Sequence, residues 1–436
     1  MKRLSLILAL AISAHGGDSL SQAIMDGKFN AEIKAWYWDI TDETKPQKNE
    51  NITNFAIELG YKTETFYDFY FGTTAQLAFA PIGDDEAKEL YIRQQHTKGL
   101  VFSELYLGYN TNKTDIKIGR QYINTPLVSA NYTRILKESF QGVSIKSNYF
   151  DTNTLYAGYA DKFQGRTSST MNEEPGSEPK FKRRITLAGA GDMSHEFDGL
   201  LWAGITNKNI ENLTLSAQYA FLKDVEFSFM PHQIGDIHLY YTEANYIVPL
   251  ENFDLKFDLN FRGSQTDGDI KKRNFNGWML AIKAGVYNIN GFDFIAAAST
   301  VSKDDSVITS AGLGGSTYTS LPIRGANMFT PTAGMDTYKL QANYDFSNIG
   351  ISGLNSSFIY VISKHSAPDE IAGMNPAGVK KEYEGYSFIL NYKTPWLKGL
   401  NASLTYTMLD QEITPKGGNT AKTDIDELWV KLSYKF

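Results

Sequence analysis

The last eleven residues of the chain, 426–436, alternate between apolar and mostly polar side chains up to the final position. One side of this segment carries Leu428, Val430, Leu432, Tyr434 and Phe436, and the other carries Glu427, Trp429, Lys431, Ser433 and Lys435. A period of two predicts a β-strand with one apolar face. Such a strand promotes aggregation at a sheet edge unless another strand pairs with it. A closed barrel supplies that partner, so the pattern favours a barrel over a soluble β-sandwich.

The composition agrees with a barrel that crosses a membrane. The chain has 436 residues, with 26 Tyr and 26 Phe, an aromatic content that suits strands and the girdles at membrane interfaces. The net charge of −7 gives no indication of a nucleic-acid partner. The absence of cysteine excludes disulfides, thiolate catalysis and cysteine-ligated metals. No apolar run reaches the roughly 18 residues of a transmembrane helix, so any crossing would be made by strands.

Residues 1–23 predict a signal peptide. Lys2 and Arg3 precede a short apolar run at 4–14, and small residues at cleavage spacing follow at 14–16 or at 21–23. We therefore expect residues 1–23 to be removed and residues 24–436 to form a single barrel outside the cytoplasm.

The rest of the chain repeats one unit, about ten alternating residues followed by a break, as tilted transmembrane strands require. Eighteen such segments run from 28–39 to 424–436, and the weakly patterned stretch 183–193 is assigned to a loop. The breaks alternate between long and short. This alternation predicts an all-β, antiparallel, up-and-down transmembrane barrel of about 18 strands with long extracellular loops and short periplasmic turns. A barrel of this size has room for a water-filled channel.

Residues 253–263 indicate which face of the predicted strands meets water. Apolar residues alternate there with Asp254, Lys256, Asp258, Asn260 and Arg262. A lysine or arginine that faces lipid at the middle of the membrane costs about 2–4 kcal/mol, so the charged row is expected to line the lumen. The same argument turns Lys117, Lys283 and Lys339 inward. Charges near strand ends instead reach water by snorkelling.

The segment after the fifth predicted strand is more specific. It runs from Ile116 through Gly119 and Arg120 to a Thr125-Pro126-Leu127 loop, then to an isolated Arg134 and to Phe140-Gln141-Gly142. The first strand carries Lys34-Ala35-Trp36-Tyr37-Trp38, and a later turn carries Asn245-Tyr246-Ile247-Val248-Pro249-Leu250. These motifs resemble the OprD family of outer-membrane porins, the substrate-specific channels of Gram-negative bacteria.

The resemblance implies a constriction made by loops. Loop 122–139 would fold into the barrel and loop 302–335 would press in from the other side, with Arg120, Arg134 and Arg324 at the constriction. Inward basic residues would guide substrate carboxylates, and the candidates are Lys34, Lys117, Lys256, Arg262, Lys283 and Lys339. The penultimate strand carries Asn401, Ser403, Thr405 and Thr407 where family members often have arginines. The lumen also holds Asp254 and Asp258, so the sign of the ion selectivity stays open.

The sequence thus predicts a porin that gives small hydrophilic solutes, including carboxylates or amino acids, a passive and partly selective route across the outer membrane. The alternatives are a lipase-like barrel enzyme and a plugged structural or adhesin barrel. No catalytic residues, cofactor or metal site are predicted, because the six histidines lack ligand spacing. The acidic loop 83–86 is either solvated or a divalent-cation site. The expected partners are solutes, outer-membrane lipids and the barrel-assembly machinery, which would recognise the strand ending at Phe436. The protein is expected to be a monomer or a loose homotrimer.

Overall fold

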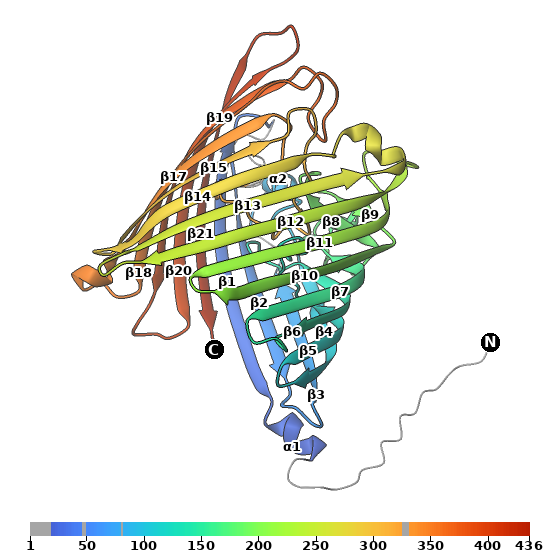
Figure 1. The fold of residues 1–436 in the computed structure, drawn as a ribbon, viewed down its shortest axis with the longest axis vertical. Helices are drawn as coiled ribbons and strands as arrows, with labels where there is room; N and C mark the ends of the chain where they lie inside the picture. Colours follow the sequence, from blue (N-terminus) through green and yellow to red (C-terminus); the bar gives the residue numbers. More distant parts are fainter. Residues whose placement is uncertain (1–18, 46–48, 80–81, 325–330) are drawn as a thin grey trace, which may run out of the picture.

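The computed structural model describes residues 19–45, 49–79, 82–324 and 331–436, and Figure 1 shows the fold. Most of the predicted signal peptide, residues 1–18, therefore lies outside the described residues. The described part begins with Ser19, whose hydroxyl accepts the N–H of Gln22 and caps the short helix α1 (Leu20–Met25). No described helix has the length and apolar character needed to cross a membrane.

Eighteen antiparallel strands form a closed barrel, which confirms the predicted fold class. In order around the barrel they are β1 (Lys28–Asp42), β2 (Asn49–Lys62), β3 (Phe69–Ala78), β4 (Gly99–Thr111), β5 (Thr114–Gln121), β6 (Ser139–Ser147), β7 (Asn153–Gln164), β10 (Gly199–Ile210), β11 (Leu213–Glu226), β12 (Ile234–Pro249), β13 (Asp254–Thr266), β14 (Trp278–Ile289), β15 (Phe292–Val301), β17 (Met335–Asp345), β18 (Leu354–His365), β19 (Lys380–Lys393), β20 (Leu400–Thr414) and β21 (Ala421–Lys435).

The last strand closes the barrel against the first. The register of β1 and β21 runs from Glu32 opposite Lys435 to Asp42 opposite Ile425. Beyond it, the backbone of Phe436 exchanges hydrogen bonds of 2.9 and 3.0 Å with Ala31. Figure 1 shows the red end of the chain beside the blue first strand. The pairing leaves neither terminal strand with a free edge, as the C-terminal pattern predicts.

Side chains alternate between the two faces of the wall. On β13, Phe257, Leu259 and Phe261 point outward and are exposed, whereas Asn260 and Arg262 point inward and are buried. The apolar core is therefore not at the centre of a packed barrel. It lies where loops pack against the inside of the wall, with Leu127, Leu187 and Ile308 among its fully buried members.

The remaining elements belong to the loops and turns. They are α2 (Asp85–Leu90), the 3₁₀ helices η1 (Ser169–Met171), η2 (Gly268–Arg273) and η4 (Phe346–Ile349), and the short strands β8 (Arg184–Ala188), β9 (Ser194–Glu196) and β16 (Ser310–Ala311). The predicted loop segment 183–193 thus contains a short strand that is not part of the barrel wall. We call residues 122–138 the third loop, 165–198 the fourth loop and 302–334 the seventh loop, after their order at the end of the barrel that carries the longer connections.

Candidate functional site

The third loop crosses the inside of the barrel. Side chains on strands from different sides of the wall bind its backbone: Lys34 of β1 donates to the Ile135 carbonyl at 3.3 Å, and Arg262 of β13 donates to the Pro126 carbonyl at 3.1 Å. The Gln218 side chain of β11 accepts the Leu127 N–H at 2.9 Å. A segment held from several directions by inward side chains must lie within the ring of strands.

The seventh and fourth loops join the third loop in a small internal sheet. Backbone hydrogen bonds connect Ser129 N–H to the Ala311 carbonyl (2.9 Å) and Ala311 N–H to the Leu127 carbonyl (2.8 Å). On its other side β16 pairs antiparallel with β8, with Ser310 opposite Ala188. We call this unit, made of residues 127–129, β16 and β8, the partition.

Two cavities adjoin the partition. The strand-side cavity has a volume of about 560 Å³ and is lined by the middle of β12, β13, β14, β15 and β17 together with the third and seventh loops. The loop-side cavity has a volume of about 740 Å³ and is lined mainly by loop residues. Both are lined by Asn124, Ser129 and the run Gly314–Ser316. The two cavities therefore meet where the third loop approaches the seventh.

Three of the predicted lumen cations come together in the strand-side cavity. Arg262, Lys283 and Lys339 all line it, as does Glu243. Lys283 forms an ion pair of 2.8 Å with Asp258, and Lys339 donates to the Ser320 carbonyl at 3.2 Å. Lys339 thus binds the seventh loop, whereas Lys283 pairs with a neighbouring wall strand and lies 4.6 Å from the Tyr318 ring of the seventh loop.

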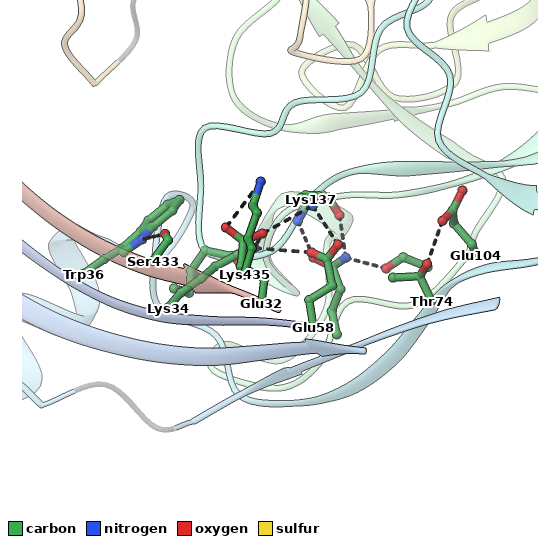
Figure 2. Close-up of polar contacts among 12 residues, drawn as sticks. Glu32, Lys34, Trp36, Glu58, Thr74, Glu104, Lys137, Ser433 and Lys435 are labelled. Atoms are coloured by element: carbon green, nitrogen blue, oxygen red, sulfur yellow. Dashed lines mark hydrogen bonds and ion pairs between the residues drawn. The ribbon is translucent and has the colours of Figure 1, made fainter. Parts of the chain in front are cut away.

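Lys34 lies in a separate charged cluster, which Figure 2 shows. Its Nζ is 3.4 Å from the Glu58 carboxylate, which also accepts Lys137 of the third loop at 2.7 Å. Glu32 lies 3.9 Å from Lys34 and 3.8 Å from Lys137. The side chain of Lys34 is only 3% exposed, so these charges are largely shielded from water. The ion pairs of Lys137 with Glu58 and Glu32 attach the end of the third loop to β2 and β1.

The other predicted lumen residues line neither cavity. Lys117 lies over the Tyr106 ring at 4.7 Å, and Lys256 lies over the Tyr287 ring at 4.3 Å. Asp254 accepts the Asn288 amide at 3.0 Å beside a short turn. Cation–π contacts of this kind anchor an ammonium group to the wall.

The three arginines predicted at the constriction occupy different places. Arg134 lines the loop-side cavity and donates to Gln94 (2.9 Å) and Thr133 (2.8 Å). Arg324 binds Asp42 and the Glu427 carboxylate at the edge of a further cavity of about 710 Å³. Arg120 is a strand residue of β5, opposite Leu105, and its guanidinium lies 4.6 Å from the Phe181 ring. The structure does not bring these three side chains into one cluster.

Several residues at the cavities were not identified from the sequence. Arg93, Arg166 and Lys381 line the loop-side cavity. Arg93 and Arg166 lie in loops, and Lys381 lies at the start of β19, outside the predicted strand 384–394, so the sequence pattern did not distinguish them from solvated charges. Glu243 faces inward two residues after Tyr241, so its position in the alternating pattern of β12 was the signal that could have found it.

Glu138, at the end of the third loop, was also missed. It is completely buried. Burial raises the pKa of its carboxyl group, while the charge of Arg166 and hydrogen bonds from the Leu313 and Asn131 N–H groups act in the opposite direction.

No group of three or more potential metal-ligating side chains occurs in the described ranges. In the acidic loop 83–86, the Asp84 carboxylate accepts the Ala87 N–H at 2.9 Å and caps helix α2. This gives Asp84 a structural role in the loop.

Comparison with known proteins connects this geometry to one family. A family model described as outer membrane porin, OprD family, matches residues 107–436. Porin D of Pseudomonas aeruginosa strain PAO1 is 22% identical over 289 residues, which are 64% of this chain and 57% of Porin D. The match thus spans less than two thirds of that relative.

Solved structures share the whole fold. OccAB2 of Acinetobacter baumannii superposes with a TM-score of 0.75 at 18% identity, covering 95% of this chain and 98% of that one. OccK9 (OpdG) of Pseudomonas aeruginosa gives a TM-score of 0.74 at 17% identity, covering 95% of this chain and 100% of that one.

Proposed function

Because the chain belongs to the OprD family of outer membrane porins, we propose that it is a passive, substrate-selective channel for small hydrophilic solutes. Family and fold place the barrel in the outer membrane of a Gram-negative bacterium. The observation that carries the proposal is the pair of cavities, each lined by charged side chains, that meet beside the partition inside a closed barrel. A solute that passes from one cavity to the other would be selected by size at the partition and by charge in each cavity.

The charges that line the cavities support a preference for anionic groups such as carboxylates. The loop-side cavity is lined by Arg93, Arg134, Arg166 and Lys381 against one carboxylate, Asp192. The strand-side cavity is lined by Arg262, Lys283 and Lys339 against Glu243. A net positive lining lowers the entry barrier for an anion. Glu243 offers a place for a cationic group, so amino acids are included in the proposed substrate class.

Single-channel recording of the purified protein in planar bilayers tests the proposal. We expect discrete conductance steps and a reversal potential that indicates anion preference in a salt gradient. A protein prepared in the same way but heat-unfolded serves as control. If the folded barrel gives no conductance, the alternative of a plugged structural or adhesin barrel replaces the channel.

The solute class is tested by the swelling of proteoliposomes. Small carboxylates and amino acids should enter faster than neutral sugars of similar size, and equal rates would contradict a charge-based preference. The family consists of channels rather than enzymes. A lipid-hydrolysis assay on the same preparation examines the lipase-like alternative, for which we expect no activity.

The proposed partners follow from the two faces of the wall. Outward apolar residues such as Phe257 and Leu259 would contact outer-membrane lipids. The barrel-assembly machinery would recognise β21, and deleting Phe436 should lower the amount of folded protein in the membrane. Mass measurement in detergent distinguishes a monomer from a loose homotrimer.

A further inference from the structure

We infer that Arg262 and Glu138 are positioning residues that hold the third, fourth and seventh loops together as one rigid body, so that the passage is bounded by a fixed partition instead of independently moving loops. This inference rests on the proposed channel function, because it concerns the width of the same passage.

Arg262 attaches both constricting loops to the barrel wall. Its Nη1 donates to the Pro126 carbonyl at 3.1 Å and to the Thr309 carbonyl at 2.8 Å, and its Nη2 donates to the Ser316 carbonyl at 3.1 Å. The guanidinium lies 4.9 Å from the Tyr241 ring and the residue is 5% exposed. The planar guanidinium of an arginine can donate hydrogen bonds to three carbonyl groups from two chain segments at once, and a lysine ammonium cannot do so with the same geometry.

Glu138 makes the complementary set of bonds. Its Oε2 accepts the Asn131 N–H of the third loop and the Leu313 N–H of the seventh loop, both at 2.9 Å. Its Oε1 accepts the Thr186 hydroxyl of β8 in the fourth loop at 3.5 Å. The carboxyl oxygens accept all three bonds, and the Asn131 and Thr186 donors would otherwise be buried without this partner. One buried residue therefore connects all three loops.

The loops also approach each other too closely to slide. An added Cβ at Gly312 would collide with the Ser129 carbonyl oxygen, and one at Gly314 would collide with the Ala130 carbonyl oxygen. The glycine-rich run 312–315 is thus explained by direct backbone contact between the seventh and third loops. Val128 and Ala311 pair in parallel at the centre of this contact and are fully buried.

Movement of either loop would remove hydrogen-bond partners from a buried guanidinium and a buried carboxylate together. Because stripping partners from a buried charged group is strongly unfavourable, the two residues oppose separation of the loops. Solutes would then pass beside the partition, through the meeting point of the two cavities, which is lined by Asn124, Ser129 and the run Gly314–Ser316.

A cross-link tests whether the loops separate during transport. The chain contains no cysteine, so the double variant Val128→Cys/Ala311→Cys can be oxidised without competing thiols, and each single variant is its control. We expect the oxidised double variant to keep the conductance and solute flux of its reduced form. A loss of half or more of the flux on oxidation, reversed by reductant, would overturn the inference.

Charge-neutral variants test the positioning role separately from electrostatics. Arg262→Gln and Glu138→Gln remove opposite charges, yet both should increase open-channel noise and brief closures, by about threefold or more. Lys256→Gln removes a cation from the same strand without a contact to these loops, and should shift the reversal potential without adding noise. If Arg262→Gln and Glu138→Gln shift the reversal potential in opposite directions and leave the noise unchanged, the two residues act as pore charges and the inference fails.

A second readout separates this inference from the channel proposal. Limited proteolysis of the folded barrel should cut residues 302–324 faster in Arg262→Gln and Glu138→Gln than in Lys256→Gln. If Arg262→Gln and Glu138→Gln are cleaved faster than Lys256→Gln but the wild-type barrel does not conduct, the channel proposal is wrong and the positioning role is supported. Equal cleavage in all three variants would overturn the positioning role whether or not the barrel conducts.

Discussion

Trp38 of the first strand and Trp429 of the last strand are directly opposite each other, with ring centroids 4.3 Å apart. Both point into the barrel and are buried. The guanidinium of Arg134 lies 5.1 Å from the Trp38 ring and 5.6 Å from the Trp429 ring. The seam that closes the barrel is thus also a support for the third loop.

Trp429→Ala should destabilise this seam. Removing a large buried aromatic side chain costs about 3–5 kcal/mol, and here it also takes away an aromatic partner of Arg134. We expect a lower unfolding temperature in detergent, measured by the loss of the compact electrophoretic form. Trp396→Ala is the matched control, since Trp396 is 72% exposed. Equal effects of the two substitutions would contradict the role of the seam.

Glu58→Gln should weaken the attachment of the third loop to β1 and β2. The substitution leaves Lys34 and Lys137 with only the more distant Glu32 carboxylate, at 3.9 and 3.8 Å. Breaking a buried ion pair from one side costs about 3–5 kcal/mol, and the remaining Glu32 contacts should reduce this loss. Asp151→Asn breaks the exposed Lys113–Asp151 pair of 3.0 Å and should leave the unfolding temperature unchanged. The prediction is wrong if Glu58→Gln unfolds at the wild-type temperature.

Reversal of lumen charges should change ion selectivity. Lys283→Glu places a second carboxylate beside Asp258 at the strand-side cavity, and Lys256→Glu reverses a predicted lumen charge on β13. The double variant should therefore lower the anion/cation permeability ratio, as measured by reversal potentials in a salt gradient. Lys223→Glu, at an exposed position of β11, is the control for net charge. An unchanged anion/cation permeability ratio in the double variant would contradict a role of Lys256 and Lys283 in ion selectivity.

Acid should loosen the fourth loop through His195. Burial lowers the pKa of this imidazole to about 3, so the folded loop holds it neutral while an opened loop protonates it near pH 6.5. The contribution of neutral His195 to the stability of the loop is therefore fully present above pH 6.5. The stability of the loop falls by about 1.4 kcal/mol per pH unit as the pH drops from 6.5 towards 3.

Hydrogen exchange of residues 184–196 at pH 7 and pH 5 measures this effect after correction for the intrinsic exchange rate. His195→Gln should remove most of the pH dependence, because a glutamine at this site can still accept the Ser228 N–H bond, which is 3.2 Å long. The same pH dependence in wild type and variant would exclude His195 as the cause.

The placement of individual cations shows where inference from sequence ends. The period-two pattern predicts that Arg262 and Lys283 face the inside of the barrel, and both side chains line the strand-side cavity. It did not show that Arg262 binds three loop carbonyls, because those partners come from loops without periodicity. Arg120 lies in β5, outside the loop, since β5 continues to Gln121.

The sequence by itself determined the closed barrel of eighteen antiparallel strands and the order of long and short connections. These features are local, because the alternation of side chains and the spacing of turns depend on about ten neighbouring residues. Only the tertiary structure decided that three loops meet in a partition held by Arg262 and Glu138. That arrangement joins Ser129 to Ala311 across much of the chain, and contacts between such distant, irregular segments depend on complementary backbone shape and buried hydrogen bonds, which no local repeat encodes.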